Sequence, residues 1–166
     1  MSREPTKHSL YLLLGANLGD KVQTFALARR YVTEQVGPIV KESGLYETAA
    51  WGVIDQPTYL NQVLLVETYL APNDVLTNTL AIEEHLGRVR HEKWGARVID
   101  IDLLFYDDLM FNTSTLTLPH PLLHERRFTL IPLAEIAPAF VHPVLKQTCQ
   151  TLLERCSDDS EVIKFS

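Results

Sequence analysis

The sequence predicts a single α+β domain over residues 1–166, in which helices cover one face of a mainly antiparallel sheet. Three observations support this fold class. The apolar runs and helical stripes follow the order βαββαβ with added pieces, which is typical of an α+β sandwich. The 166-residue length suits one domain, and its 46% hydrophobic and 22% charged content is that of an ordinary globular chain. No apolar run approaches the ~18 residues that span a bilayer, so we expect no membrane partner.

The first elements are a strand and a helix joined by a turn. The apolar run over residues 8–14 predicts a buried strand. Residues 15–20 have turn chemistry, and Asp20 can cap the following helix. The apolar stripe of that helix continues to Val36, and Gly37-Pro38 ends it.

Two further strands and a second helix form the middle of the predicted domain. Residues 39–46 predict a strand, and residues 60–70 predict another that is apolar on both faces for much of its length. Residues 47–58 between them are expected to form a loop. The second helix is predicted from Pro72 to Leu86, and Gly87 is expected to stop it.

The last predicted elements are a hairpin and two helices. Residues 98–106 predict a fourth main strand, and Asp107-Asp108 resembles a hairpin turn into a short partner strand over residues 109–112. Helices are expected from about residue 125 to 136 and from about residue 145 to 155.

Charge and cysteine content narrow the partners and the compartment. Fifteen Lys and Arg residues against 21 Asp and Glu residues give a net charge of −6, whereas nucleic-acid binders are more often basic. The polar tail of about residues 1–7 has no apolar core of a secretory signal. Cys149 and Cys156 would share one helical face, too far apart for a comfortable disulfide. We therefore expect free thiols, a cytoplasmic location and no nucleic-acid partner.

The segment around Asp100 and Asp102 carries the strongest single signal for chemistry. The two acids stand two apart in a predicted strand, so they share a face while Ile99, Ile101 and Leu103 take the other. Adjacent carboxylates repel each other, and a hard cation such as Mg²⁺ removes that conflict while leaving room for phosphate oxygens. The alternative, which the pair alone leaves open, is a solvated face of an edge strand.

A charged loop over residues 88–97 directly precedes the acid pair. Its basic and aromatic residues are Arg88, Arg90, His91, Lys93, Trp94 and Arg97. Arginine suits bidentate phosphate contact, and cations beside paired carboxylates are what a metal-bound polyphosphate needs. Trp94 with its neighbouring glycine fits a flap that closes over such a site. A merely solvated charged loop is the alternative.

Other nucleotide and metal signatures do not occur in the sequence. It contains no phosphate loop ending in Gly-Lys-Ser/Thr and no kinase Gly-rich loop. The glycines within residues 15–20 better suit a tight strand-to-helix turn. His85 and His91 do not pair with cysteines at zinc spacing. If the protein uses ATP, it therefore binds ATP on a different scaffold.

Four segments, taken together and in order, resemble the 6-hydroxymethyl-7,8-dihydropterin pyrophosphokinase family of folate biosynthesis. They are residues 15–19, 55–61, 87–102 and 118–128. The third segment is long and specific, and the resemblance spans about residues 9–157. It implies a ferredoxin-like βαββαβ fold whose antiparallel sheet is covered by helices, with an added hairpin and C-terminal helices.

The resemblance also implies a reaction. The family transfers the terminal pyrophosphate of ATP to the 6-hydroxymethyl oxygen of the reduced pterin and releases AMP. Asp100 and Asp102 would hold two Mg²⁺ ions, and Arg88 and Arg97 look like catalytic arginines that clamp the phosphates. The partners would be ATP and the pterin, bound by a monomer.

The remaining site residues follow from the same resemblance. Contacts to ATP are expected from Glu83, Arg88, Arg90, Trp94, Arg97, Ile99, Thr117, His120 and Arg126. Contacts to the pterin are expected from Thr48, Ala49, Trp51, Tyr59, Asn61, Trp94, Asp100 and Phe128. Tyr59 and Phe128 would stack on the pterin ring, while Thr48 and Asn61 would form hydrogen bonds to it. From the residues alone, Glu83 could instead face solvent and Phe128 could belong to the core.

Two other function classes stay open at this level. A metal-dependent nuclease or phosphatase could use the same acids, and a non-catalytic module could bind a nucleotide through the same loop. Formation of AMP only in the presence of the reduced pterin would distinguish the transferase from both.

Overall fold

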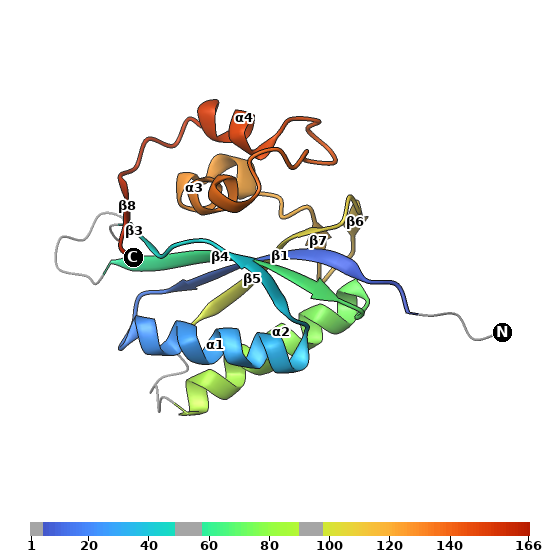
Figure 1. Cartoon of the computed structure of the whole chain (residues 1–166), viewed down its shortest axis with the longest axis vertical. Helices are drawn as coiled ribbons and strands as arrows, with labels where there is room; N and C mark the ends of the chain where they lie inside the picture. The colour runs from blue at the N-terminus through green and yellow to red at the C-terminus, as the bar shows by residue number, and fades with distance from the viewer. Residues whose placement is uncertain (1–4, 49–57, 90–97) are drawn as a thin grey trace.

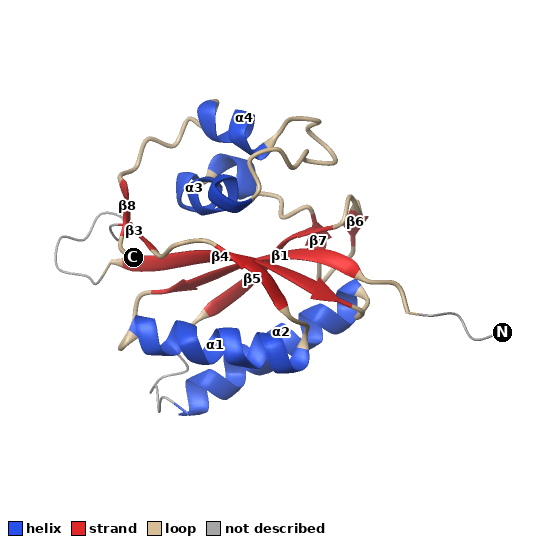
Figure 2. Cartoon of the chain, in the orientation of Figure 1, coloured by secondary structure: helices blue, strands red, loops and turns tan. Residues whose placement is uncertain are grey.

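The computed structural model describes residues 5–48, 58–89 and 98–166 and confirms an α+β fold (Figures 1 and 2). Along the chain the elements are β1 (His8–Ala16), α1 (Lys21–Gln35), β2 (Ile39–Glu42), β3 (Tyr46–Thr48), β4 (Tyr59–Thr68), α2 (Pro72–Val89), β5 (Asp100–Tyr106), β6 (Phe111–Asn112), β7 (Thr117–Leu118), the 3₁₀ turn η2 (Leu123–Glu125), α3 (Arg127–Ile136), α4 (Cys149–Glu154) and β8 (Val162–Lys164). The main sheet has the order β5-β1-β4-β3-β8, with β2 also paired to β4. All of its described pairings are antiparallel.

The sheet lies between two helical layers, with α1 and α2 on one face and α3 and α4 on the other (Figure 1). Strand alternation separates the two cores. Leu12 and Leu14 of β1 join the cluster under α1 and α2, whereas Tyr11 and Leu13 join the cluster under α3 and α4. The prediction of helices on one face is therefore correct for α1 and α2 and wrong for the C-terminal pair. The apolar residues on both faces of β1 and β4 need a cover on each side.

The turn after β1 begins later than the sequence predicts. Gly15 lies inside β1 instead of in the turn, and among the described glycines only Gly19 has a left-handed φ, of 63°. Asp20 caps α1 as predicted, since its side chain accepts a hydrogen bond from the backbone N–H of Gln23 at 3.1 Å. Gly15 therefore does not serve the turn.

The strand predicted over residues 39–46 is interrupted. Both β2 and β3 pair with β4, but between them the Ser43 Oγ accepts a hydrogen bond from the backbone N–H of Val63 at 2.9 Å. A side chain thus replaces a backbone acceptor, and the ladder breaks locally. Pairing resumes in β3, which extends to Thr48.

The second helix continues past the residue expected to end it. α2 includes Gly87 and reaches Val89, where the described segment ends. A glycine stops a helix by adopting a left-handed conformation, which Gly87 does not. A Cβ at position 87 would meet no atom within 4 Å, so close packing does not explain the glycine.

The turn at Asp107 forms, but the predicted hairpin is wrong. β6 pairs with β7 in a separate two-stranded sheet instead of pairing with β5. Two other groups occupy the outer edge of β5. Glu83 Oε2 accepts from the backbone N–H of Ile101 at 2.6 Å, and the backbone N–H of His120 donates to the Leu104 carbonyl at 2.9 Å.

The C-terminal helices are shorter than predicted. α3 begins at Arg127, because Arg126 is extended, with φ of −121° and ψ of 109°. α4 begins at Cys149 with Thr148 as its cap, and Lys146 before it has a φ of 59°, which a helix does not accept. The pairing of β8 with β3 was not predicted.

Both cysteines are free thiols, as predicted. Cys149 is buried at the start of α4, but Cys156 lies beyond the end of this helix, so the two do not share a helical face. Within the part of the chain that the structure describes, no helix is both long enough and apolar enough to cross a membrane.

Candidate active site

Three neighbouring strands place a polar row on the sheet face that α3 covers. Gly15 of β1 stands opposite Asn61 of β4 on one side and opposite Asp100 of β5 on the other. Strand alternation puts this row on the same face as Tyr11 and Leu13, which belong to the α3 and α4 core. Asn61 is only 4% exposed, and its Oδ1 would lie 3.1 Å from a Cβ at position 15. Gly15 is therefore the residue that leaves room for the Asn61 amide.

The acid pair shares this face, as the spacing predicts. Ile101 and Leu103 are buried in the opposite core under α1 and α2. Asp100 and Asp102 consequently face the α3 side, and both are half-buried. Residues two apart on a strand are separated by roughly 6.5 Å, so ligands bound between the two carboxylates can contact both.

His120 lies close to Asp102, in the segment after β7. Its Nδ1 accepts a hydrogen bond from the backbone N–H of Leu122 at 3.2 Å. Burial lowers the pKa of His120; the Asp102 carboxylate raises it and the Arg126 guanidinium lowers it, with a net decrease. A neutral His120 whose Nδ1 is an acceptor carries its proton on Nε2, which makes Nε2 a hydrogen-bond donor.

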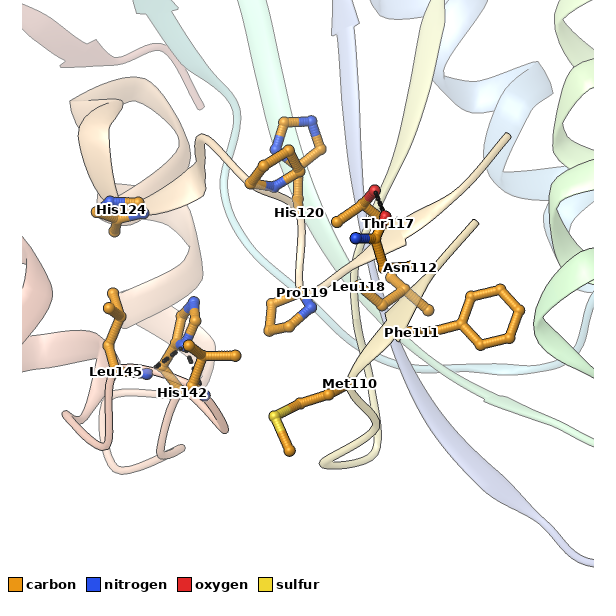
Figure 3. Close-up of a pocket in the computed structure, with 12 residues that line it drawn as sticks. Met110, Phe111, Asn112, Thr117, Leu118, Pro119, His120, His124, His142 and Leu145 are labelled. Atoms are coloured by element: carbon orange, nitrogen blue, oxygen red, sulfur yellow. Dashed lines mark hydrogen bonds between the residues drawn. The ribbon is translucent and has the colours of Figure 1, made fainter. Parts of the chain in front are cut away.

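Two hollows meet at His120. One of about 300 Å³ is bordered by Asp102, Thr117 and His120, three of the predicted site residues. The second, of about 380 Å³, shares Thr117 and His120 with the first and is otherwise mostly apolar. In this second hollow, His124 and His142 lie on one side and the β6–β7 hairpin on the other (Figure 3). The first hollow is the one beside Asp102.

The predicted pterin contacts within the described residues also lie on the α3 side of the sheet. Thr48 pairs with Tyr59, which has the same strand parity as Asn61. Thr48 is buried and Tyr59 is 42% exposed. Phe128, in the first turn of α3, packs partly buried against the α3 and α4 core, and the Arg126 guanidinium carbon lies 5.7 Å from its ring centroid. The four predicted residues thus share one face of the molecule.

Sequence reasoning missed one residue near the site, Glu135 of α3. Its carboxylate accepts hydrogen bonds from the Tyr46 hydroxyl and the Gly44 backbone N–H, both at 2.8 Å, and lies 3.1 Å from Lys164 Nζ. Burial tends to raise the pKa of Glu135, but these partners outweigh it and lower the pKa; burial together with Glu135 raises the pKa of Tyr46 to about 12. Glu135 therefore ties α3 to the strand that carries Thr48. A single charge within an apolar helix was the only signal.

The other predicted residues have varied positions. Ile99, a predicted nucleotide contact, is 1% exposed and belongs to the core under α1 and α2. Arg88 lies in α2, but its side chain is outside the described part of the structure. Five more lie outside the described residues: Ala49, Trp51, Arg90, Trp94 and Arg97.

Residues 11–138 match the model of the 7,8-dihydro-6-hydroxymethylpterin-pyrophosphokinase family. The chain belongs to this family. It is 45% identical over 132 residues to the 2-amino-4-hydroxy-6-hydroxymethyldihydropteridine pyrophosphokinase of Methylorubrum extorquens, covering 79% of this chain and 84% of that protein. It is 40% identical over 139 residues to the Aquifex aeolicus protein of the same name, covering 84% and 86%. The predicted family is thus confirmed.

Longer relatives contain a similar domain. The chain is 40% identical over 139 residues to the folic acid synthesis protein FOL1 of Dictyostelium discoideum, of which it covers 21%. Among solved structures, a Plasmodium falciparum HPPK-DHPS protein matches with a TM-score of 0.78 and 18% identity. The match covers 93% of this chain and 44% of that one, and it confirms the fold class alone.

Proposed function

We propose that this protein transfers the terminal pyrophosphate of ATP to the hydroxymethyl oxygen of 6-hydroxymethyl-7,8-dihydropterin and releases AMP. Its family and the names of its relatives support a pyrophosphokinase of folate biosynthesis. The observation that carries the proposal is the row Asn61, Gly15 and Asp100. This row places a hydrogen-bonding amide and the acid pair on one face, on either side of a residue without a side chain.

The row suits a flat ring with a short hydroxymethyl arm. Adjacent strands lie ~4.8 Å apart, so Asn61 and Asp100 stand roughly 10 Å apart across Gly15. The amide edge of a pterin would meet Asn61, and its hydroxymethyl group would point to Asp100. We propose that Tyr59 and Phe128 offer the aromatic surfaces for the ring, because stacking adds ~0.5–1.5 kcal/mol beyond burial. Thr48, Ala49, Trp51 and Trp94 complete the proposed pterin contacts.

The acid pair has the chemistry of a magnesium site. Among the described residues, no group of three or more His, Cys, Asp or Glu side chains could hold a metal ion. Mg²⁺ commonly takes only one or two carboxylates and keeps water and phosphate oxygens as its other ligands, so Asp100 and Asp102 fit it. We propose that they hold two Mg²⁺ ions. When bound, magnesium neutralises phosphate charge and lowers the pKa of a coordinated hydroxyl.

The transfer is an in-line displacement at the β-phosphorus. The hydroxymethyl oxygen forms a bond to this phosphorus, the bond to the oxygen bridging the α- and β-phosphates breaks, and that oxygen leaves with AMP. The pterin hydroxyl releases its proton to water. His120 Nε2–H and Arg126 would donate to the triphosphate beside Asp102, and Thr117 borders the same hollow.

The other proposed nucleotide contacts come from the end of α2 and from the residues between α2 and β5 in the sequence. Arg88 and Arg97 would clamp the two transferred phosphates, because arginine matches phosphate oxygens in pairs. Arg90, Trp94 and Ile99 complete this set of proposed contacts. Arg88, Arg90 and Arg97 bring positive charge to an otherwise acidic protein.

We further propose a monomer that works in the cytoplasm. Free thiols fit a reducing compartment. An open edge strand invites pairing with another chain, but Glu83 and His120 occupy groups on the outer edge of β5.

The product of the reaction tests the proposal directly. The protein is incubated with ATP, Mg²⁺ and the reduced pterin, and the nucleotides are separated by chromatography. We expect AMP and the pterin diphosphate in equal amounts, and only with all three components present. ADP, or loss of ATP without pterin, would overturn the proposal in favour of a phosphatase-type activity. Binding of ATP without any product would favour a non-catalytic module.

A further inference from the structure

The carboxylate of Glu83 reaches from α2 to the strand that carries the acid pair. Its Oε2 accepts a hydrogen bond from the backbone N–H of Ile101 at 2.6 Å. Ile101 stands between Asp100 and Asp102 in the sequence. A side chain from another element therefore fixes the one residue that separates the two acids.

This bond matters because β5 is at the edge of the sheet. β5 pairs with β1 on one side, and the sheet order ends with it on the other. On such a strand, alternate backbone groups point outward with no neighbouring strand to fix them. The Ile101 N–H is tied by Glu83 and the Leu104 carbonyl by the His120 N–H. The outer edge of β5 is thus held at two points, one of them at the acid pair.

We propose that Glu83 is a positioning residue for the two magnesium-binding acids and acts through its bond to Ile101. The proposal rests on the proposed function, because it takes Asp100 and Asp102 as the metal ligands. Bonds from a carboxylate to an N–H are charge-assisted and short, as this one is. Groups that orient metal ligands typically change metal affinity by about 10- to 100-fold when they are removed. In this proposal Glu83 acts on the two acids through the backbone of β5.

Two substitutions separate the reach of Glu83 from its charge. Glu83→Gln keeps the length of the side chain and an acceptor oxygen but removes the charge. Glu83→Asp keeps the charge but is one methylene shorter and cannot reach Ile101. If Glu83 acts through its hydrogen bond, Glu83→Gln, which keeps a weaker bond, should be affected much less than Glu83→Asp, which cannot form it. Glu84→Gln is the matched control, because Glu84 is an exposed neighbour on the same helix.

Two measurements without turnover read out the role. Amide hydrogen exchange by NMR on the metal-free protein reports the Ile101 N–H, and we expect exchange about tenfold or more faster in Glu83→Asp, with little change in Glu83→Gln. Mn²⁺ titration in the presence of an ATP analogue with a methylene bridge between the α- and β-phosphates reports the metal site. There we expect about tenfold weaker binding in Glu83→Asp and less than about threefold change in Glu83→Gln and Glu84→Gln.

Three outcomes would overturn the proposal. The first is unchanged Ile101 exchange in Glu83→Asp, and the second is unchanged Mn²⁺ affinity in that variant. The third is a Glu83→Gln variant that protects Ile101 yet binds Mn²⁺ about tenfold more weakly, since charge and not position would then be the cause. The third test stands even if Glu83→Asp does not fold. No measurement needs pterin, so a protein that makes no AMP would overturn only the proposed function.

Discussion

The sheet face under α1 and α2 packs into an apolar core, whereas the face under α3 and α4 carries the polar row and the acid pair. On the first face Leu12, Leu14 and Phe25 are fully buried. On the second face Asn61 and Asp100 stand beside Gly15, where the strands bring no bulky side chain. The same strands supply both faces, because their residues alternate sides. Substitutions of residues that face α1 and α2 should therefore change stability, and substitutions of residues that face α3 and α4 beside the acid pair should change activity.

The largest effect is expected from Phe25→Ala in the core under α1 and α2. Removing a fully buried aromatic side chain costs ~3–5 kcal/mol of unfolding free energy, because a cavity remains. At a temperature where the variant is still folded, its turnover should stay close to that of the wild type. Urea unfolding and initial rates on the same preparation check both statements. A large loss of turnover in the folded variant would mean that the two faces are not separable.

The second largest effect is expected from Asp102→Asn on the site face. Loss of one charged ligand should lower turnover by about 10²–10³-fold, which is about 2.7–4 kcal/mol in the barrier. Stability should change little, because the variant removes one of two repelling carboxylates. Steady-state rates at saturating Mg²⁺ and a thermal melt are the measurements. Asp108→Asn, at an exposed residue just after β5, is the control that should keep full activity.

Local patterns predicted which face the acid pair takes, because one strand was enough for that. The spacing of Asp100 and Asp102 requires a shared face, and the buried Ile101 between them confirms it. The relation of Gly15 to Asn61 could not be predicted, because it depends on the register between β1 and β4. A glycine that suits a turn in the sequence lies instead inside β1, where a Cβ would come within 3.1 Å of the Asn61 Oδ1 on the next strand.

Long-range contacts explain most of the errors in the predicted fold. The hairpin partner of β5 is wrong because Glu83 and His120 bind its outer edge, and neither is a neighbour in sequence. The tether from Glu135 to Tyr46 joins residues 89 positions apart. Boundary errors, such as the start of α3, have a local cause in the extended Arg126. Helix caps and residue spacing could therefore be predicted from the sequence, whereas the contacts at the outer edge of β5 could not.

A smaller effect is expected from Phe128→Ala, at an aromatic residue that belongs either to the ligand site or to the core. Phe128→Ala should weaken pterin binding by ~1–3 kcal/mol, because both burial and stacking against the ring are lost. Phe140→Ala is the matched variant: Phe140 contacts Phe105, with ring centroids 4.6 Å apart, inside the same core. It should lower stability and leave pterin affinity unchanged. Calorimetric titration with pterin distinguishes the two, and equal affinities for both variants would assign Phe128 to the core.

The smallest effect should appear as a pH dependence confined to the α3 and α4 side. His142 is 4% exposed, its Nδ1 accepts from the backbone N–H groups of Val144 and Leu145, and burial together with His124 lowers its pKa to about 4. An unfolded histidine binds a proton below pH ~6.5. Between pH 6.5 and 4 the unfolded state therefore binds more protons, and stability must fall as the pH is lowered through this range.

His142→Asn keeps an acceptor oxygen for the two backbone groups but removes the titration. The variant should lose less stability than the wild type on acidification, by about 1 kcal/mol at pH 5.5. Urea unfolding at pH 7.5, 6.5 and 5.5 measures the difference, and titrating groups that do not interact with His142 cancel between the two proteins. Parallel pH curves would show that His142 is protonated equally in both states.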